Sequence, residues 1–191
     1  MKVPAHIVDD LTRVATELQE TILEQPELAP RDRSLPDRDR VIRLISDLQE
    51  ILFPGYFGSL KGKGPDLACL VEKLGTLYWQ LTSLIHDTIS HSCPLPCDQG
   101  CHDFRWSSRL AADFLSALPE VRRVLALDVQ AALEGDPAAR DFDEIILSYP
   151  GVYAIMVYRL AHELHKRGVR LIPRIMTEHA HSITGIDIHP G

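Results

Sequence analysis

Apolar residues recur at intervals of three and four through most of the chain, which predicts a succession of amphipathic helices. In the first of them Ile7, Leu11, Val14, Leu18 and Ile22 form one stripe. A stripe of this kind is typical of a helix that buries one face. The polar stretch 26–36 interrupts the pattern, and the next apolar stripe predicts a helix that starts near residue 37.

Glycines and prolines divide the rest of the pattern into further helices. The segment 53–64, with the sequence FPGYFGSLKGKG, is rich in glycine and is a predicted loop. Pro119 and Pro150 each suit the first turn of a helix, and Gly168 suits the position just after a helix end. The helical pattern fails across 90–102. The predicted helices therefore cover about 67–85, 104–115, 119–134, 150–167 and 171–181.

The last residues of the chain have a different pattern. From Ile183 to Gly191 the sequence ITGIDIHPG alternates β-branched residues with small and polar ones and closes on Pro-Gly. This alternation is typical of an extended segment and not of a helix. The pattern therefore predicts that helical structure ends at residue 182.

Composition agrees with a soluble globular protein and narrows the set of partners. Of the 191 residues, 45% are hydrophobic and 25% are charged, and the formal net charge is −7. An acidic balance argues against nonspecific binding to nucleic acid, which depends on Lys and Arg at phosphates. The amino terminus has no signal-peptide pattern, and no window approaches the roughly 20 apolar residues that cross a bilayer. We therefore expect a cytoplasmic protein with no nucleic-acid or membrane partner.

Three cysteines and a histidine gather in the segment where the helical pattern fails. Cys93, Cys97, Cys101 and His102 have the spacing C-x3-C-x3-C-H. In a reducing compartment cysteines of this kind are thiols or metal ligands and not a disulfide framework. Zinc takes four sulfur or nitrogen ligands, and an iron–sulfur cluster takes cysteines. The segment is therefore a candidate site for zinc or an iron–sulfur cluster, and a loop with free thiols is the alternative.

Three blocks in the second half of the chain resemble serine O-acetyltransferases. They are LALDVQAALEGDPAA at 125–139, SYPGVYAIMVYRLAHELHKRG at 148–168 and HSITGIDIHPG at 181–191. The resemblance implies a helical amino-terminal domain followed by a left-handed parallel β-helix of hexapeptide repeats. That β-helix starts at the Asp-Ile-His-Pro motif. We therefore expect an all-α bundle over residues 1–182 and the first turn of the β-helix over 183–191, with most of the β-helix missing from this sequence.

The resemblance also implies an activity. Serine O-acetyltransferases move the acetyl group of acetyl-CoA to the hydroxyl of L-serine and give O-acetylserine for cysteine biosynthesis, with no resident cofactor. The family's general base is a histidine in an Asp-His motif of the β-helix, and this sequence contains no Asp-His pair. We therefore expect no catalytic residue in these 191 residues and no activity from them alone. The family implies a homo-oligomer, a trimer or a dimer of trimers, and O-acetylserine sulfhydrylase as a partner.

One aspartate matches a substrate contact of the family. Asp136, followed by Pro137, corresponds to the aspartate that reaches the amino group of serine from the helical domain. The same Gly-Asp-Pro sequence also suits a plain turn at a helix end, and both roles are compatible. Asp128 lies in phase with an apolar stripe, where a carboxylate has to be paired, and we expect it to be structural.

Two other interpretations remain open from the sequence. The chain suits a non-catalytic helical module that forms oligomers or binds a metal. It also suits a hexapeptide-repeat acetyltransferase with a different small acceptor, because most acceptor contacts of that class lie in the β-helix.

Overall fold

The computed structural model describes residues 4–28, 35–62, 64, 66–92 and 104–191. Within these ranges every regular element is a helix and no β-strand is present. The chain divides into two compact units, Met1–Arg33 and Ser34–Gly191. No helix in the described ranges is both long enough and apolar enough to cross a membrane.

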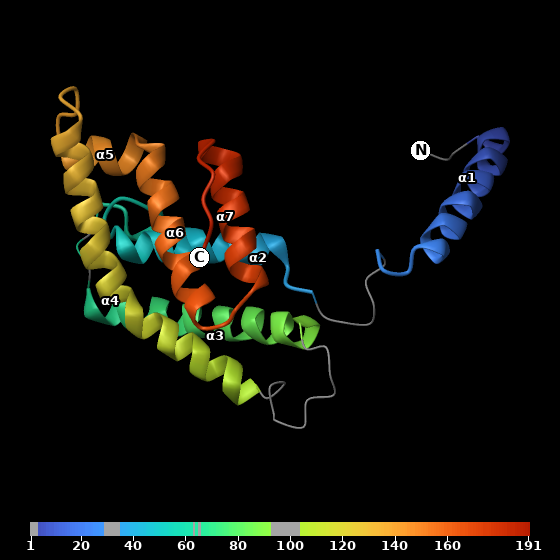
Figure 1. The fold of residues 1–191 in the computed structure, drawn as a ribbon, viewed down its shortest axis with the longest axis horizontal. Coiled ribbons are helices and arrows are strands. Elements are labelled where there is room, and N and C mark those ends of the chain that lie inside the picture. The colour runs from blue at the N-terminus through green and yellow to red at the C-terminus, as the bar shows by residue number, and fades with distance from the viewer. Residues whose placement is uncertain (1–3, 29–34, 63, 65, 93–103) are drawn as a thin grey trace. The chain divides into compact units, whose positions relative to one another are not determined.

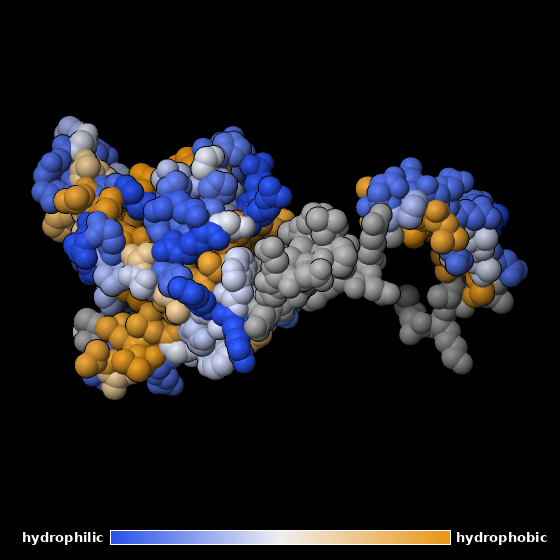
Figure 2. Space-filling model, turned by 60° about the horizontal axis from the view of Figure 1, so that its bottom comes forward, coloured by the Kyte–Doolittle hydropathy of each residue, from blue (hydrophilic) through white to orange (hydrophobic). Residues whose placement is uncertain are grey.

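The first unit consists of helix α1, Ala5–Glu24, which confirms the first predicted helix. Its apolar stripe is exposed, since Leu11 keeps 53% and Leu18 57% of their surface accessible. Figure 2 shows apolar groups along one side of this helix. The expected burial of the stripe is therefore not observed, because the described part of this unit contains no second helix that covers it.

The second unit begins with two helices that the sequence predicted and a loop between them. Helix α2, Arg38–Leu52, starts at Asp37, whose side chain accepts hydrogen bonds from the backbone N–H groups of Asp39 and Arg40. A short 3-10 helix, η1 at Gly58–Leu60, lies in the predicted loop. Helix α3, Leu67–Ser92, follows.

Helix α4, Phe104–Gly135, is a single helix, so the predicted break at Pro119 is wrong. A proline inside a helix removes one backbone hydrogen bond and costs about 3 kcal/mol. Each buried Val, Leu or Phe side chain contributes about 1.5–3 kcal/mol, so several of them on one stripe outweigh that cost. The stripe runs past Pro119 without interruption and consists of Ala111, Phe114, Leu118, Val121, Leu125 and Val129, all buried.

The chain ends in three helices, one of which the sequence did not predict. The apolar pattern does not indicate helix α5, Phe142–Ser148, because only Ile145 of its seven residues is buried. Helix α6, Pro150–Lys166, starts at Pro150 as predicted, and Gly168 follows its end with a positive φ of 80°. Helix α7 is Leu171–Thr184. Figure 1 shows α5 connecting the end of α4 to the start of α6.

The helices of the second unit pack around one core. Helix α6 lies between α4 and α7, and α2 contacts both α3 and α7. The largest fully buried side chains come from α2, α3, α4, α5 and α6 and include Leu44, Leu48, Leu81, Ile85, Phe114 and Met156. The all-helical part of the fold prediction is therefore confirmed for the described residues.

The final segment is not helical, but it starts later than predicted. Helix α7 continues through Thr184, and Gly185 ends it with a φ of 72°. The residues after it lie against α6, where the carbonyl of Pro190 is 2.7 Å from Nδ1 of His162. Ile188 also packs against the core. Helix α7 still buries Ala180 near its end, and it continues beyond the last apolar residue of the pattern because the next residue that favours a helix end is Gly185.

Candidate substrate-binding site

Asp136 lies in a tight turn directly after helix α4. Its Oδ1 accepts a hydrogen bond from the N–H of Ala138 at 2.9 Å, and its carbonyl accepts one from the N–H of Ala139 at 3.0 Å. An aspartate that bonds the backbone two residues on is a common turn device. The structure therefore confirms the turn role of Asp136, and Pro137 lies exposed within the turn.

The second oxygen of the carboxylate has a partner from another part of the chain. The hydroxyl of Tyr149 donates to Oδ2 of Asp136 at 2.5 Å. Tyr149 is the residue between α5 and α6, and it caps both helices. Sequence reasoning missed this contact because thirteen residues and a whole helix separate the two groups. The available signal was the Tyr-Pro-Gly sequence at a helix start, in the second block that resembles the family.

The contact between these side chains changes the pKa of both groups. The Tyr149 hydroxyl, and next the N–H of Ala138, lower the pKa of Asp136 below its usual range. The Asp136 carboxylate raises the pKa of Tyr149 to about 12. At neutral pH the aspartate is therefore an anion and the tyrosine a protonated donor. A half-exposed carboxylate in this state suits a small cationic group such as an ammonium.

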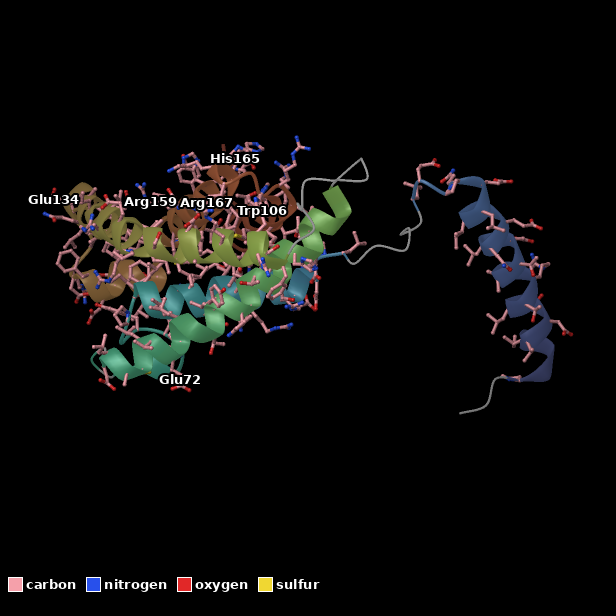
Figure 3. The ribbon with its side chains drawn as sticks, turned by 90° about the horizontal axis from the view of Figure 1, so that it is seen from below. Glu72, Trp106, Glu134, Arg159, His165 and Arg167 are labelled. Carbon is pink, nitrogen blue, oxygen red and sulfur yellow. The ribbon has the colours of Figure 1, made fainter. Side chains whose placement is uncertain are left out.

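The site lies at one end of the helical bundle. In Figure 3 the labelled Glu134, two residues before Asp136, marks the end of α4, and Arg159 lies farther along the bundle. Within the turn, Asp136 has backbone N–H groups and the exposed Pro137 ring as neighbours. Its carboxylate is the only charged side chain of residues 135–139.

Asp128 has the structural role that its position on the apolar stripe predicted. Its two oxygens accept a bidentate pair of bonds from Arg159, at 2.6 Å from Nε and 2.8 Å from the terminal nitrogen. Both side chains are largely buried, with 20% and 28% of their surfaces exposed. The pair joins α4 to α6, and the guanidinium balances the Asp128 charge that a substrate ammonium would need.

The metal prediction falls on a part of the chain that the structure does not describe. Cys93, Cys97, Cys101 and His102 all lie outside the described residues, so zinc or an iron–sulfur cluster at this segment stays a prediction. In the described ranges no group of three or more His, Cys, Asp or Glu side chains is placed to hold a metal ion.

Several curated serine acetyltransferases are similar to this chain in sequence. The chain is 37% identical to a plasmid-encoded serine acetyltransferase of Synechococcus elongatus over 166 residues, which are 82% of this chain and 50% of the relative. The chain is related to the serine acetyltransferases. A serine acetyltransferase of Mycobacterium tuberculosis is 52% identical over 64 residues, covering 34% of this chain and 28% of that protein. The chain thus spans about half the length of the Synechococcus serine acetyltransferase and a smaller share of the Mycobacterium one. No family model matches it.

Solved serine acetyltransferase structures share the fold. Serine acetyltransferase 1 of Entamoeba histolytica, in complex with L-cysteine, matches with a TM-score of 0.63 and 29% identity, over 98% of this chain and 63% of that one. Isoform 3 from the same organism, also in complex with cysteine, matches with a TM-score of 0.62 and 27% identity over 86% of this chain and 51% of that one. The all-helical arrangement is consistent with the helical domain of these enzymes.

Proposed function

We propose that the protein that contains this chain is a serine O-acetyltransferase. It moves the acetyl group of acetyl-CoA to the L-serine hydroxyl and supplies O-acetylserine for cysteine biosynthesis. The observation that carries the proposal is the similarity to the Synechococcus serine acetyltransferase across 82% of the chain. The Ala138 N–H and the Tyr149 hydroxyl also support it, because both donate to Asp136 and favour its anion where the amino group of serine would bind.

The reaction sets clear chemical demands. The serine hydroxyl gives its proton to a general base while its oxygen attacks the thioester carbonyl, and a tetrahedral oxyanion forms. When this intermediate collapses, the C–S bond breaks and the leaving sulfur of coenzyme A takes up the proton from the base. A hydroxyl needs a general base at neutral pH, and the oxyanion that forms needs hydrogen-bond donors. In this proposal both come from the hexapeptide-repeat segment that follows the Asp-Ile-His-Pro motif in the family.

This chain would supply one part of the substrate site. We assign the serine ammonium to the Asp136 carboxylate, with the Pro137 ring beside it as a rigid wall. In this proposal the helical domain extends to the end of α7 at Thr184, and the residues after it form the entry to the β-helix. By analogy with the family the protein would be a trimer or a dimer of trimers and would bind O-acetylserine sulfhydrylase.

Replacement of Asp136 tests the proposal. In a polypeptide that contains residues 1–191 and acetylates serine, Asp136→Ala should lower kcat/KM for serine by about 10- to 150-fold through the lost charge-assisted contact. Asp136→Asn should fall close to Ala, because an amide accepts a hydrogen bond but does not balance the ammonium charge. Acetyl-CoA kinetics should stay nearly unchanged. The measurement is steady-state thiol release with serine varied at saturating acetyl-CoA.

The Asn variant separates the two roles of the aspartate. Asn also forms turns of this kind. If Asp136→Asn has the serine kinetics of the unmodified protein, Asp136 is a turn residue only and the proposed ammonium contact is wrong.

Cysteine is a second ligand that this site would accept. It carries the same ammonium and carboxylate as serine, and the Entamoeba enzymes were solved with it. We propose that cysteine competes with serine at Asp136 in the whole protein. In the same assay the Asn variant would then lose cysteine inhibition together with serine use.

A further inference from the structure

The two oxygens of the Asp136 carboxylate are held independently. The N–H of Ala138, inside the turn, binds Oδ1, whereas the Tyr149 hydroxyl binds Oδ2 from the junction of α5 and α6. The turn needs only the first of these bonds. The second bond therefore has no role in forming the turn, and its effect is on the orientation of the carboxylate.

Tyr149 is held in a rigid frame on its own side of the contact. Its N–H donates to the carbonyl of Ile145 at 3.2 Å, and its carbonyl accepts from the N–H of Val152 at 3.1 Å. Its ring packs against the hydrophobic core. The hydroxyl is therefore fixed relative to the bundle, and a carboxylate that binds it takes one orientation.

We propose that Tyr149 is a positioning residue for serine, because its hydroxyl fixes the Asp136 carboxylate in the orientation that receives the substrate ammonium. An ionised carboxylate has about four acceptor positions, so two remain free after the bonds to Ala138 and Tyr149. A preoriented acceptor saves the entropy of ordering the side chain when the substrate binds. The proposal rests on the proposed binding of serine by Asp136.

The chain contains a matched control pair. The Tyr56 hydroxyl donates to Asp143 at 2.6 Å, so it is a second tyrosine–aspartate bond in the same unit. Tyr56→Phe removes the same hydroxyl as Tyr149→Phe and leaves Asp136 untouched. Both substitutions keep the aromatic ring and its packing.

The first experiment measures the contact without reference to catalysis. Carboxyl carbon NMR of the 191-residue protein should show that Tyr149→Phe raises the pKa of Asp136 toward its ordinary range, whereas Tyr56→Phe leaves it unchanged. An Asp136 pKa that does not respond to Tyr149→Phe would overturn the inference at this step, because the bond would then be absent in solution.

The second experiment measures the consequence for serine. In the serine-acetylating polypeptide, obtained if needed by joining the Synechococcus acyltransferase segment after Gly191, Tyr149→Phe should raise KM for serine by about 3- to 10-fold, as one lost hydrogen bond would. The kcat and the acetyl-CoA KM should change little. Because serine binding needs the anion, kcat/KM falls as pH drops through the Asp136 pKa, and in Tyr149→Phe this fall should begin at a higher pH.

The variants together distinguish failure of the inference from failure of the proposed function. If Asp136→Asn impairs serine use but Tyr149→Phe matches Tyr56→Phe, the positioning role is wrong and the ammonium contact stands. If Asp136→Asn has no effect on serine, the proposed contact and the positioning role are both wrong. Support requires that Tyr149→Phe add nothing to Asp136→Asn, since a positioning residue acts only through the group it positions.

Discussion

At the scale of single residues, the structure separates two aspartates that the sequence places eight positions apart. Asp128 is paired with the cationic guanidinium of Arg159, whereas Asp136 is bound only by neutral donors, a hydroxyl and a backbone N–H. A carboxylate whose charge is balanced by a neighbouring guanidinium stabilises the fold, and a half-exposed one that has only neutral donors keeps a negative charge that suits a cationic ligand. The same residue type therefore has two different roles at the two positions.

Removal of Asp128 should destabilise the fold and not the substrate contact. Asp128→Ala leaves the guanidinium of Arg159 largely buried without its acceptor, which should lower the free energy of unfolding by about 1–3 kcal/mol. In the double variant with Arg159→Ala the loss should be smaller than the sum of the two single losses. Urea unfolding followed by circular dichroism measures all three.

An exposed ion pair provides the control for these Asp128 and Arg159 variants. Arg174 and Glu178 pair at 2.8 Å on α7 with 52% of each side chain exposed. Glu178→Ala should change the free energy of unfolding by less than about 1 kcal/mol, as is usual for surface pairs. Equal losses for Asp128→Ala and Glu178→Ala would contradict a specific role of the buried pair.

At the scale of elements, a buried carboxylate holds the loop between α2 and α3 in place. Glu50 is only 6% exposed and accepts bonds from the Leu60 N–H at 2.7 Å, the Ser59 hydroxyl at 2.8 Å and the Lys73 ammonium at 2.9 Å. Burial would raise the pKa of Glu50, but the bonds from Lys73 and Ser59 outweigh it, so the pKa is lowered. A carboxyl with a lowered pKa stabilises the fold above its unfolded-state pKa, and this contribution is lost as the pH falls through the lower, folded-state value.

The loop contains a glycine, Gly58, that both a left-handed backbone and the nearby Glu50 carboxylate favour. Gly58 has a φ of 59°, and a Cβ there would lie 2.5 Å from the carboxyl carbon of Glu50. Gly62 has a φ of 72° with nothing within 4 Å of its Cβ position. A side chain in this left-handed region costs about 1–2 kcal/mol by itself.

Alanine at the two glycines should therefore give different losses of stability. Gly62→Ala should lower the free energy of unfolding by about 1–2 kcal/mol. Gly58→Ala should lower it by at least about 1 kcal/mol more, because the Glu50 carboxylate has to move away from its donors. Urea unfolding of both variants decides the matter, and equal losses would show that the close approach to Glu50 is absent in solution.

At the scale of the whole molecule, the serine contact that we propose at Asp136 is only one part of what the proposed reaction needs. Figure 2 shows a patch of apolar groups on the lower part of the larger unit, while Asp136 lies in the turn after α4. The activity that we propose needs a base and an acetyl-CoA site, and this sequence has no Asp-His pair of the kind that the family uses.

The 191-residue polypeptide by itself should therefore not acetylate serine. Loss of a general base alone lowers a rate by about 10²- to 10⁴-fold, and loss of acetyl-CoA binding removes the reaction. Thiol release from acetyl-CoA, with and without serine, measures whether the polypeptide acetylates serine. Serine-dependent release above the buffer rate would show that this chain holds its own base and acetyl-CoA site.

The sequence by itself determined most of the helices, because apolar residues at intervals of three to four indicate one apolar face of a helix, whatever covers that face. The helix starts at Asp37 and Pro150 and the glycine after α6 were likewise predictable, since capping and φ preferences are local. The resemblance in residues 125–191 supplied the family and the turn aspartate.

Only the tertiary structure decided the features that depend on contacts between distant segments. Pro119 lies inside a helix because burial of the whole stripe outweighs one missing hydrogen bond, and local preference does not report that burial. The short helix α5 is too brief for periodicity, yet it determines where Tyr149 lies. The bond from Tyr149 to Asp136 exists because α5 connects α4 to α6, and a contact of this kind is a property of packing that no spacing along the chain reveals.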